Sequence, residues 1–320
     1  MNLRLKLYPL SALLMIGIAF LASCDAIIEP SISKKQVILE APADQYQSSS
    51  YSINFWWDEV EHALSYRLQV VSQSFASPGG LVLDTVVTKN RFSFTLDPGK
   101  YQWRVLAQNG SSQTAFANPR DLEVEASSIK LQTVQLNSPA NNLITNQSVQ
   151  TFQWGSLFGA TKYRFEIDTN NFSNESTILS NQIIPGQQLN YTFPKDQSYQ
   201  WRVRAENDTA QSRWSAINSI IYDHTPPAVP ALVSPTNGQT VSLPVTLQWG
   251  AVTTAVRYKL YVFKSDSTSL YNTSFPLSVT TTSYSFNLGS PGDKIYWKVS
   301  ALDAAGNEGQ ASELRSFVLQ

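Results

Sequence analysis

The side chains that commonly carry out catalysis are few in this sequence and lie far apart. Only two histidines occur, His62 and His224, and neither has a cysteine close to it in the sequence. The sequence holds no HExxH, GxSxG or phosphate-binding-loop pattern. A histidine without such partners is most simply a surface side chain. The sequence therefore predicts a non-catalytic protein with no metal site and no cofactor.

Two acidic stretches, residues 58–61 and 303–308, bring carboxylates close together. Neighbouring carboxylates can serve acid–base chemistry or bind calcium. The second stretch lacks the ligand spacing of a calcium loop and has the composition of a turn. The first stretch is not kept in the two other copies of the repeat described below. We interpret the first stretch as a solvent-exposed loop and the second as a turn between two strands.

Trp56 is the residue best suited to binding. It sits in a run where Ile53, Phe55 and Trp57 alternate with polar residues, so period-two alternation places Trp56 on the outer face of a strand. Asn54 and Asp58 flank it on that face. An exposed indole beside hydrogen-bonding groups can stack on a sugar ring or a partner protein. The alternative is that the N-terminal segment or an adjacent loop covers the ring.

These residues belong to a unit that occurs three times. A tryptophan is followed by a tyrosine nine residues later in each copy, and this tryptophan recurs after 97 and then 95 residues. A second tryptophan recurs after 98 and then 96 residues. The three pairs are Trp57 with Trp103, Trp154 with Trp201, and Trp249 with Trp297. Spacing held this closely indicates one structural unit repeated in series.

The pattern within each unit is that of short antiparallel strands. Apolar and polar residues alternate over runs such as 53–58, 66–71 and 101–108, and segments rich in proline and glycine separate them. No segment after the first 24 residues has helical periodicity over a helical length. About 95 residues per unit with this pattern predict an all-β fold of three tandem sandwiches, each made of two sheets.

The motif Tyr-x-Trp-x-Val-x-Ala-x-Asn, at 101–109 and again at 199–207, resembles strand F of fibronectin type III modules. This resemblance implies three immunoglobulin-like sandwiches without disulfides. It also implies a tyrosine-corner hydrogen bond at Tyr101 and Tyr199. Ile295 takes that position in the third copy, so no corner is expected there. Trp214 matches the start of strand G in the family and is expected to pack rather than bind.

The register of the repeats predicts the organisation of the chain. A tether precedes three modules joined by short linkers, so we expect a rod with the first module nearest the N-terminus. The predicted segments are a signal peptide at 1–23, a lipidated tether at 24–33, and fibronectin type III-like modules at 34–128, 129–223 and 224–320.

The first 24 residues have the pattern of an export signal. Arg4 and Lys6 precede an apolar run from Leu10 to Leu21 that is short for a permanent membrane span. The segment from Leu21 to Cys24 reads Leu-Ala-Ser-Cys and resembles the lipobox of bacterial lipoproteins. This resemblance implies cleavage before Cys24, the only cysteine, and attachment of lipid to its sulfur. The mature chain would then be held to a membrane through its N-terminal lipid.

Charge offers little support for a nucleic-acid partner. The chain holds 23 basic and 24 acidic residues, and loss of Arg4 and Lys6 with the signal would leave a net charge of −3. Nucleic-acid binding needs a basic face. Basic residues do recur on the predicted outer faces of two central strands in each module. We interpret them as exposed ladders that aid solubility or contact an acidic glycan. The ladder residues are Arg67, Arg104, Arg164, Arg202, Arg204, Lys259 and Lys298.

Together these features indicate a non-catalytic lipoprotein of the cell envelope whose modules bind a partner or act as spacers. Two more specific functions remain as alternatives. One is a surface glycan-binding accessory lipoprotein of a polysaccharide-uptake system, a group whose outer-membrane members share this plan. The other is an adhesin or a structural subunit of an envelope complex. The outer membrane is the expected location, and the sequence leaves open which face of it and whether the partner is a protein or a glycan.

Overall fold

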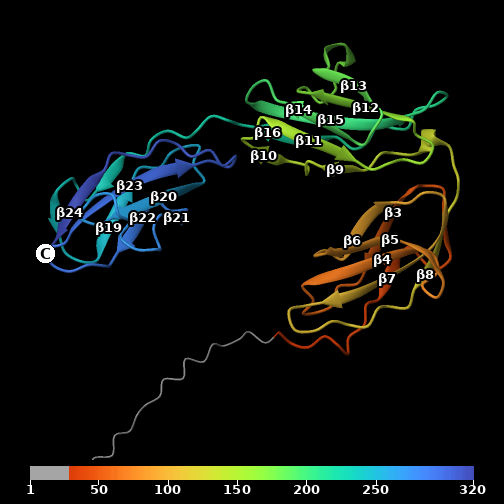
Figure 1. Cartoon of the computed structure of the whole chain (residues 1–320), viewed down its shortest axis with the longest axis horizontal. Helices are drawn as coiled ribbons and strands as arrows, with labels where there is room; N and C mark the ends of the chain where they lie inside the picture. Colours follow the sequence, from red (N-terminus) through yellow and green to blue (C-terminus); the bar gives the residue numbers. More distant parts are fainter. Residues whose placement is uncertain (1–28) are drawn as a thin grey trace, which may run out of the picture.

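The computed structural model describes residues 29–320, and these form three β-sandwiches in sequence order (Figure 1). Within this range the regular structure consists of strands and two short 3₁₀ helices, η1 (Ile129–Leu131) and η2 (Glu175–Thr177). The strands build six sheets, two for each module. The predicted all-β fold of three tandem sandwiches is confirmed. The expected signal peptide, lipobox and Cys24 lie outside the described residues.

The first module pairs a three-stranded sheet with a five-stranded sheet. Its small sheet has the order β1-β3-β6 and its large sheet the order β2-β8-β7-β4-β5. Both sheets are antiparallel except where β2 runs parallel to β8. This division of strands is the immunoglobulin-like arrangement. The strands are β1 (Leu39–Ala41), β2 (Tyr46–Ser48), β3 (Ser52–Trp57), β4 (Ser65–Gln73), β5 (Pro78–Val87), β6 (Arg91–Thr95), β7 (Gly99–Gln108) and β8 (Arg120–Val124).

The second module repeats this plan, with sheets β9-β11-β14 and β10-β16-β15-β12-β13. Its strands are β9 (Leu136–Ser138), β10 (Leu143–Thr145), β11 (Val149–Trp154), β12 (Lys162–Asp168), β13 (Ser180–Ile184), β14 (Gln188–Thr192), β15 (Gln197–Glu206) and β16 (Asn218–Tyr222). The third module has sheets β17-β19-β22 and β18-β24-β23-β20-β21. Its strands are β17 (Leu232–Ser234), β18 (Gln239–Val241), β19 (Val245–Trp249), β20 (Arg257–Phe263), β21 (Leu277–Val279), β22 (Ser283–Phe286), β23 (Lys294–Leu302) and β24 (Arg315–Leu319).

Each core forms because one face of every strand is apolar, so that two sheets bury these faces against each other. The six repeated tryptophans are at most 2% exposed and lie between the sheets. Aromatic rings pack edge to face around them, as Phe55 does against Trp103 and Phe152 against Trp201. Their indole N–H groups have no hydrogen-bond partner. The tryptophans therefore stabilise the fold through packing.

The tyrosine corners occur where the resemblance placed them. The hydroxyl of Tyr101 donates a hydrogen bond to the Asp97 carbonyl oxygen at 2.8 Å, and that of Tyr199 to the Lys195 carbonyl oxygen at 2.7 Å. Ile295 occupies the corresponding place in the third module and is buried. Each corner fixes the turn that precedes strand β7 or β15.

The junction between the first two modules is packed. Gln132 is 3% exposed, and its amide oxygen accepts a hydrogen bond from the Tyr51 backbone N–H at 2.9 Å. The Tyr51 ring packs edge to face against Phe158 of the second module, with 6.1 Å between ring centres. The Gln135 side chain accepts a hydrogen bond from the Thr95 hydroxyl at 3.2 Å. The linker is therefore part of both modules and not a free spacer.

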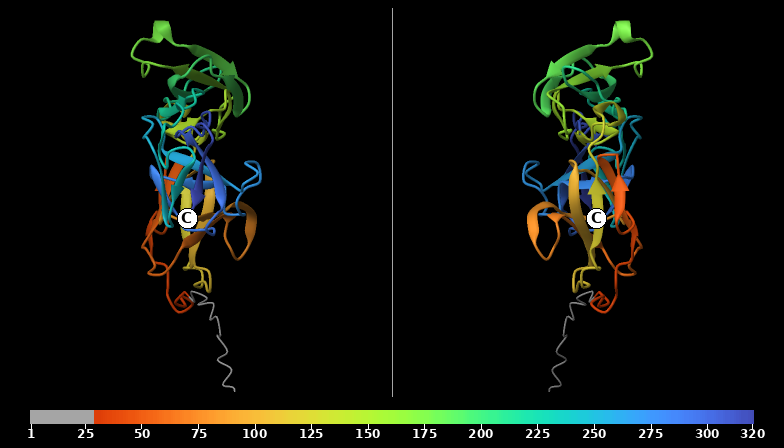
Figure 2. Two further views of the ribbon diagram at one scale, coloured as in Figure 1. Left: turned by 90° about the vertical axis from the view of Figure 1, so that its left-hand side faces the viewer. Right: turned by 90° about the vertical axis from the view of Figure 1, so that its right-hand side faces the viewer.

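Polar and close backbone contacts also join the second module to the third. The Asn307 side chain donates to the Asp223 carbonyl oxygen at 2.8 Å. A Cβ atom on Gly309 would lie 2.2 Å from the Pro227 carbonyl oxygen, so only glycine fits there. The second module lies at the bend of an arc, with the first and third modules on the same side of it (Figures 1 and 2). The expected series of three modules is therefore bent, because the packed linkers set an angle between modules.

The end of the predicted tether at 24–33 is also part of the first module. Ile32 is fully buried in the core, and its backbone N–H donates to the Ser112 hydroxyl at 2.9 Å. The Glu29 carboxylate accepts a hydrogen bond from the Gly110 backbone N–H at 2.5 Å. The sequence did not predict this, because a single isoleucine in a mixed polar segment has no periodicity. The first module thus includes Glu29 and Ile32.

Candidate binding site on the first module

Trp56 lies on the outer face of β3 and is 49% exposed, whereas its neighbours Phe55 and Trp57 are fully buried. The alternation of the strand therefore predicted the orientation of all three rings. The alternative, that the N-terminal segment covers the Trp56 ring, is not met by residues 29–38. Glu29 and Ile32 make their contacts with residues 110 and 112 of the loop after β7. Among the described residues, the ring of Trp56 is left accessible to a ligand.

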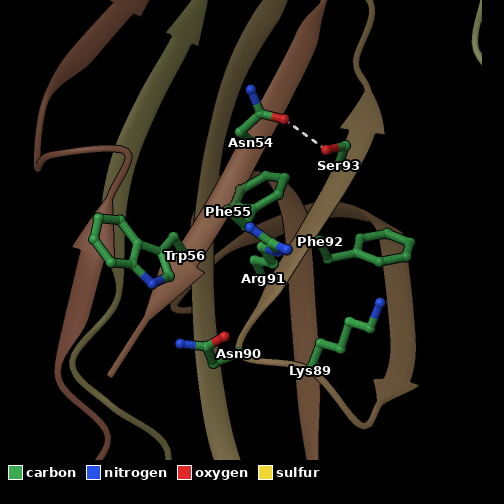
Figure 3. Close-up of a pocket in the computed structure, with 8 residues that line it drawn as sticks. All are labelled: Asn54, Phe55, Trp56, Lys89, Asn90, Arg91, Phe92 and Ser93. Carbon is green, nitrogen blue, oxygen red and sulfur yellow. Dashed lines mark hydrogen bonds between the residues drawn. The ribbon is translucent and has the colours of Figure 1, made fainter. Parts of the chain in front are cut away.

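A surface groove of about 860 Å³ runs beside Trp56 (Figure 3). It lies over strands β3 and β6 and the loop that joins β5 to β6. Its lining residues are Asn54, Phe55, Trp56, Lys89, Asn90, Arg91, Phe92 and Ser93. A concave site that combines an aromatic face with a few polar groups is the usual form of a small-ligand site.

The register of β3 on β6 decides which residues face Trp56. Arg91 lies directly opposite Trp56, and Ser93 lies opposite Asn54. The Ser93 hydroxyl donates to the Asn54 side-chain oxygen at 2.5 Å, which orients the Asn54 amide. The Asn90 amide donates to the Trp57 carbonyl oxygen at 3.0 Å and so fixes the loop before β6. The groove is thus built on two paired strands.

Of the three residues predicted for this site, Trp56 and Asn54 come together in the groove. Asp58 is not among the residues that line it. Its backbone N–H donates to the Ile38 carbonyl oxygen at 2.9 Å at the end of β3, and its side chain is exposed. Asp58 was placed by extending the strand alternation one step beyond the last strand residue, Trp57. The structure ends the strand there, and the alternation no longer applies.

The groove also contains Lys89, Asn90, Arg91 and Ser93, which were not predicted from the sequence. They lie about 35 residues after Trp56 in the chain and reach it only through the pairing of β6 with β3. The register of one strand on another is not readable from a single sequence. A systematic comparison of the three repeats would have aligned Arg91 with Gln188 and Ser283 and shown that the first copy differs there.

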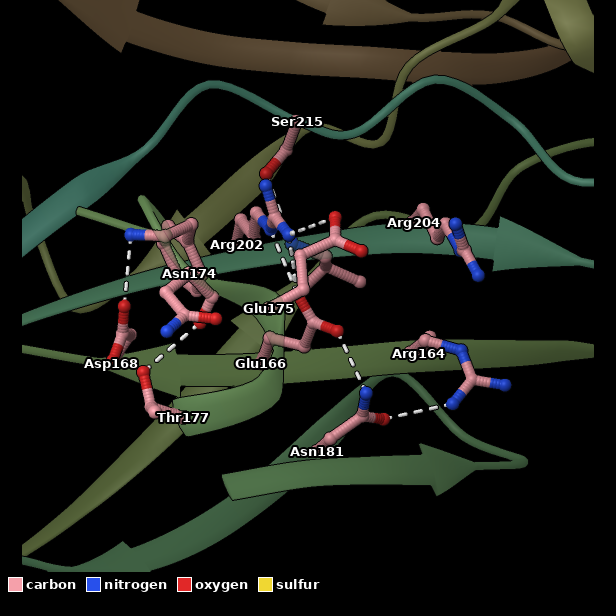
Figure 4. A network of polar contacts seen from close by, with 12 residues as sticks. Arg164, Glu166, Asp168, Asn174, Glu175, Thr177, Asn181, Arg202, Arg204 and Ser215 are labelled. Carbon is pink, nitrogen blue, oxygen red and sulfur yellow. Dashed lines mark hydrogen bonds and ion pairs between the residues drawn. The ribbon is translucent and has the colours of Figure 1, made fainter. Parts of the chain in front are cut away.

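The predicted cation ladders are not the exposed rows that we expected. Arg67 is paired with Asp84 at 2.6 Å, and Lys259 with Glu308 at 3.1 Å. In the second module Arg202 lies 2.7 Å from Glu166, whose side chain is 4% exposed (Figure 4). Acidic partners on neighbouring strands or turns were not visible in the alternation of single strands. The ladders are therefore largely neutralised within each module.

Two arginines of these ladders are also sandwiched between aromatic rings. The Arg104 guanidinium lies 3.9 Å from the centre of Phe75 and 4.1 Å from that of Phe116. Arg202 lies 4.1 Å from both Phe172 and Trp214. Cation–π contacts of this kind stabilise a fold by up to about 2 kcal/mol when desolvated. Trp214 is therefore a packing residue, as the sequence indicated.

The ion pairs shift the pKa of their carboxylates. Hydrogen bonds from Arg67 lower the pKa of Asp84 below its ordinary value. Burial alone would raise the pKa of Glu206, but hydrogen bonds from Arg164 and Arg204, at 2.7 and 2.8 Å, lower it overall. Both carboxylates are therefore ionised at neutral pH and neutralise the arginines beside them. Those arginines have little tendency to bind an acidic ligand.

The remaining candidate catalytic and metal-binding residues do not come together in the structure. His62 lies in the turn between β3 and β4, and His224 lies in the linker after β16. Residues 29–320 contain no group of three or more histidine, cysteine or carboxylate residues placed to hold a metal ion. In the turn at 303–308, Asp303 is buried and accepts hydrogen bonds from Asn307 at 2.9 Å. This stretch is thus a turn between β23 and β24 that is held by internal hydrogen bonds.

Comparisons with known proteins add distant structural likenesses. No protein-family model matches the chain, and no curated protein matches it in sequence. A crystal structure of the FN1-FN3 domains of chicken CNTN1 is similar at 15% identity over 88% of this chain and 96% of that chain, with a TM-score of 0.41. The fibronectin(III)-like modules of Clostridium thermocellum CbhA are similar at 12% identity over 58% and 94%, with a TM-score of 0.38. The fold assignment above rests on the strand order of the chain itself.

Within residues 29–320, no helix has the length and apolar character needed to cross a lipid bilayer.

Proposed function

We propose that this protein is a non-catalytic lipoprotein of the cell envelope whose three sandwiches form a binding array, with the Trp56 groove as its ligand site and a glycan as its ligand. The observation that carries the proposal is the placement of a half-exposed indole opposite polar side chains in a groove. Indole faces stack on sugar rings, and amide and hydroxyl groups at the edge bond to sugar hydroxyls.

Three features of the groove support a glycan over a protein surface. Its strands form a rigid backbone, so the site does not have to order on binding. Asn54 and Ser93 present hydrogen-bonding groups that are already oriented by their 2.5 Å contact. The exposed apolar surface at the site comes from Trp56 and the partly exposed Phe92, and it is not a broad patch of the kind that marks protein interfaces.

A second candidate, an adhesin or structural subunit, is favoured by a different region. Strand β5 is ten residues long and forms the edge of the large sheet of the first module. Leu81 and Val86 on this strand are 62% and 55% exposed. A long edge strand with exposed apolar side chains can pair with a strand of another chain. This function would use β5 and leave the Trp56 groove unused.

Glycan-array binding of the full chain and of Trp56→Ala tests the proposed ligand site. We expect the wild-type chain to retain at least one glycan, with about tenfold or greater loss in Trp56→Ala and an unchanged melting temperature. Gln153→Ala alters the corresponding position of the second module and should leave binding intact. Pull-down from envelope extract tests the second candidate in parallel. Retention of a protein by both the wild type and Trp56→Ala, with no glycan bound, would reject the groove.

The lipid anchor is a separate part of the proposal and rests on the Leu-Ala-Ser-Cys segment alone. Labelled palmitate should enter the wild-type protein and not Cys24→Ala, and equal labelling of both would reject the anchor. Multiple acyl chains hold a protein stably at a membrane. Protease treatment of intact cells distinguishes display on the outer surface from a location inside the outer membrane.

A further inference from the structure

The Trp56 groove carries local positive charge. Lys89 and Arg91 both line it, and its eight lining residues include no carboxylate. This charge is not a property of the whole module, since residues 34–128 hold eight basic and ten acidic side chains. Figure 3 shows the Lys89 and Arg91 side chains on the same stretch of chain, with Arg91 between Trp56 and Phe92.

The two cations differ from those of the neighbouring sheets. Arg67, Arg164 and Lys259 each have a carboxylate partner within about 3 Å. Among residues 29–320, the side chains of Lys89 and Arg91 make no ion pair or hydrogen bond. Lys89 and Arg91 line one groove without an anionic partner, and like charges in such a position repel each other. The fold supplies acidic partners for several cations of the large sheets and supplies none in the groove.

This arrangement fits one class of sugar. A guanidinium binds a carboxylate or sulfate in a two-pronged manner, and such charge-assisted bonds are stronger than neutral ones. Arg91 lies directly opposite Trp56 on the paired strand, so a ring stacked on the indole would place its substituents near Arg91. Lys89 adds a second positive charge at the same end of the groove.

We propose, on the basis of the proposed function, that the ligand is an acidic saccharide whose anionic groups sit between Lys89 and Arg91 while a sugar ring stacks on Trp56. The groove has a direction. Its charged end is at the β5–β6 loop, and its neutral end at Asn54 and Ser93 leads toward the linker, where the Gln135 amide donates to the Ser93 carbonyl oxygen at 3.3 Å. The saccharide chain runs from the charged end toward the module junction.

The experiment uses the full chain and a matched pair of probes. One probe is a galacturonic acid hexasaccharide, and the other is the same oligosaccharide after its carboxyl groups have been reduced to alcohols. Calorimetry or interferometry measures Kd for the wild type, for Lys89→Gln with Arg91→Gln, and for Trp56→Ala. The control is Arg257→Gln with Lys264→Gln, which removes two exposed cations from the third module.

We expect the acidic probe to bind the wild type at least tenfold more tightly than the reduced probe, because each charge-assisted bond is worth about a tenfold change in Kd. The double substitution at 89 and 91 should remove this preference and leave affinity for the reduced probe unchanged. Trp56→Ala should weaken both probes. The control should behave as wild type, and affinity for the acidic probe should fall with added salt.

Three results would overturn the inference. Equal Trp56-dependent binding of both probes would retain the glycan site and reject its acidic specificity. Binding of the acidic probe that survives both the Trp56 and the Lys89/Arg91 substitutions would place the ligand elsewhere and reject the groove itself. A single-stranded oligothymidylate that binds as tightly as the uronate, with the same dependence on both substitutions, would show that the site reads anionic stacked rings and not sugars.

Discussion

The first and second modules share an interior and differ on the surface. Trp57 and Trp154 occupy the same place on strands β3 and β11, and both are at most 2% exposed. One residue earlier, the outer face holds Trp56 opposite Arg91 in the first module and Gln153 opposite Gln188 in the second. Packing between sheets constrains the inner residue in both modules, whereas the outer residue is free to vary. This difference coincides with the proposed binding site.

The outer faces of the large sheets also differ, and here the second module carries the larger network of charged groups. In the second module, Asn181 bridges Glu166 and Arg164, and Arg164 and Arg204 share Glu206, so that the polar groups form one connected network (Figure 4). In the first module the corresponding face holds two more exposed ion pairs, Arg67 with Asp84 and Lys100 with Glu123, and Gln69 links Asp84 to Arg104. The second module therefore has its charged groups satisfied internally. The first module keeps Lys89 and Arg91 available.

Substitution inside the core should have the largest effect. Trp57→Ala removes a fully buried ring and should destabilise the first module by about 3–5 kcal/mol. Trp56→Ala should change the free energy of unfolding by about 1 kcal/mol or less, because about half of the residue already faces water. Thermal unfolding with hydrogen exchange resolved by module measures both. A loss in Trp56→Ala as large as that in Trp57→Ala would show that Trp56 is a structural residue.

Breaking the buried ion pair should have the next largest effect. Glu166→Ala leaves the Arg202 guanidinium, whose side chain is 11% exposed, with only the exposed Glu175 carboxylate at 3.7 Å and should cost at most about 3 kcal/mol. Asp84→Ala in the first module should cost much less, since Arg67 is 45% exposed and water screens that pair. Urea unfolding of the two variants compares them. Equal losses would mean that the network of the second module is no stronger than a surface pair.

Transfer of the groove to the second module should have the smallest energetic effect and the clearest functional one. Gly186, Gln187 and Gln188 stand where the first module has Lys89, Asn90 and Arg91, and a side chain on Gly186 would meet nothing within 4 Å. The triple substitution Gln153→Trp, Gly186→Lys and Gln188→Arg should raise the number of bound saccharides per chain from one to two. Titration calorimetry measures this number of bound saccharides per chain. A ratio that stays at one would show that the groove needs more than these three side chains.

The sequence predicted much of the fold because its signals are local. The nine-residue gap between Trp57 and Tyr66 recurs in each copy, and alternation along a strand assigns every side chain to one face. That was enough to bury Trp57 and expose Trp56. It placed Asp58 outward, as observed, but could not show that this residue lies outside the groove. It also failed at Ile32, whose burial depends on a loop about 80 residues away. The angle between modules was not predictable either, since it depends on contacts such as that of Tyr51 with Phe158.

The sequence by itself determined three repeated sandwiches, their inward tryptophans and one outward tryptophan, because these follow from spacing and from the two-residue period of a strand. Only the tertiary structure decided what surrounds that tryptophan. Strand register, which depends on the packing of both sheets together, placed Arg91 across from Trp56 and left Asp58 outside the groove. The same long-range pairing gave Arg164 and Arg202 acidic partners and gave Lys89 and Arg91 none among the described residues.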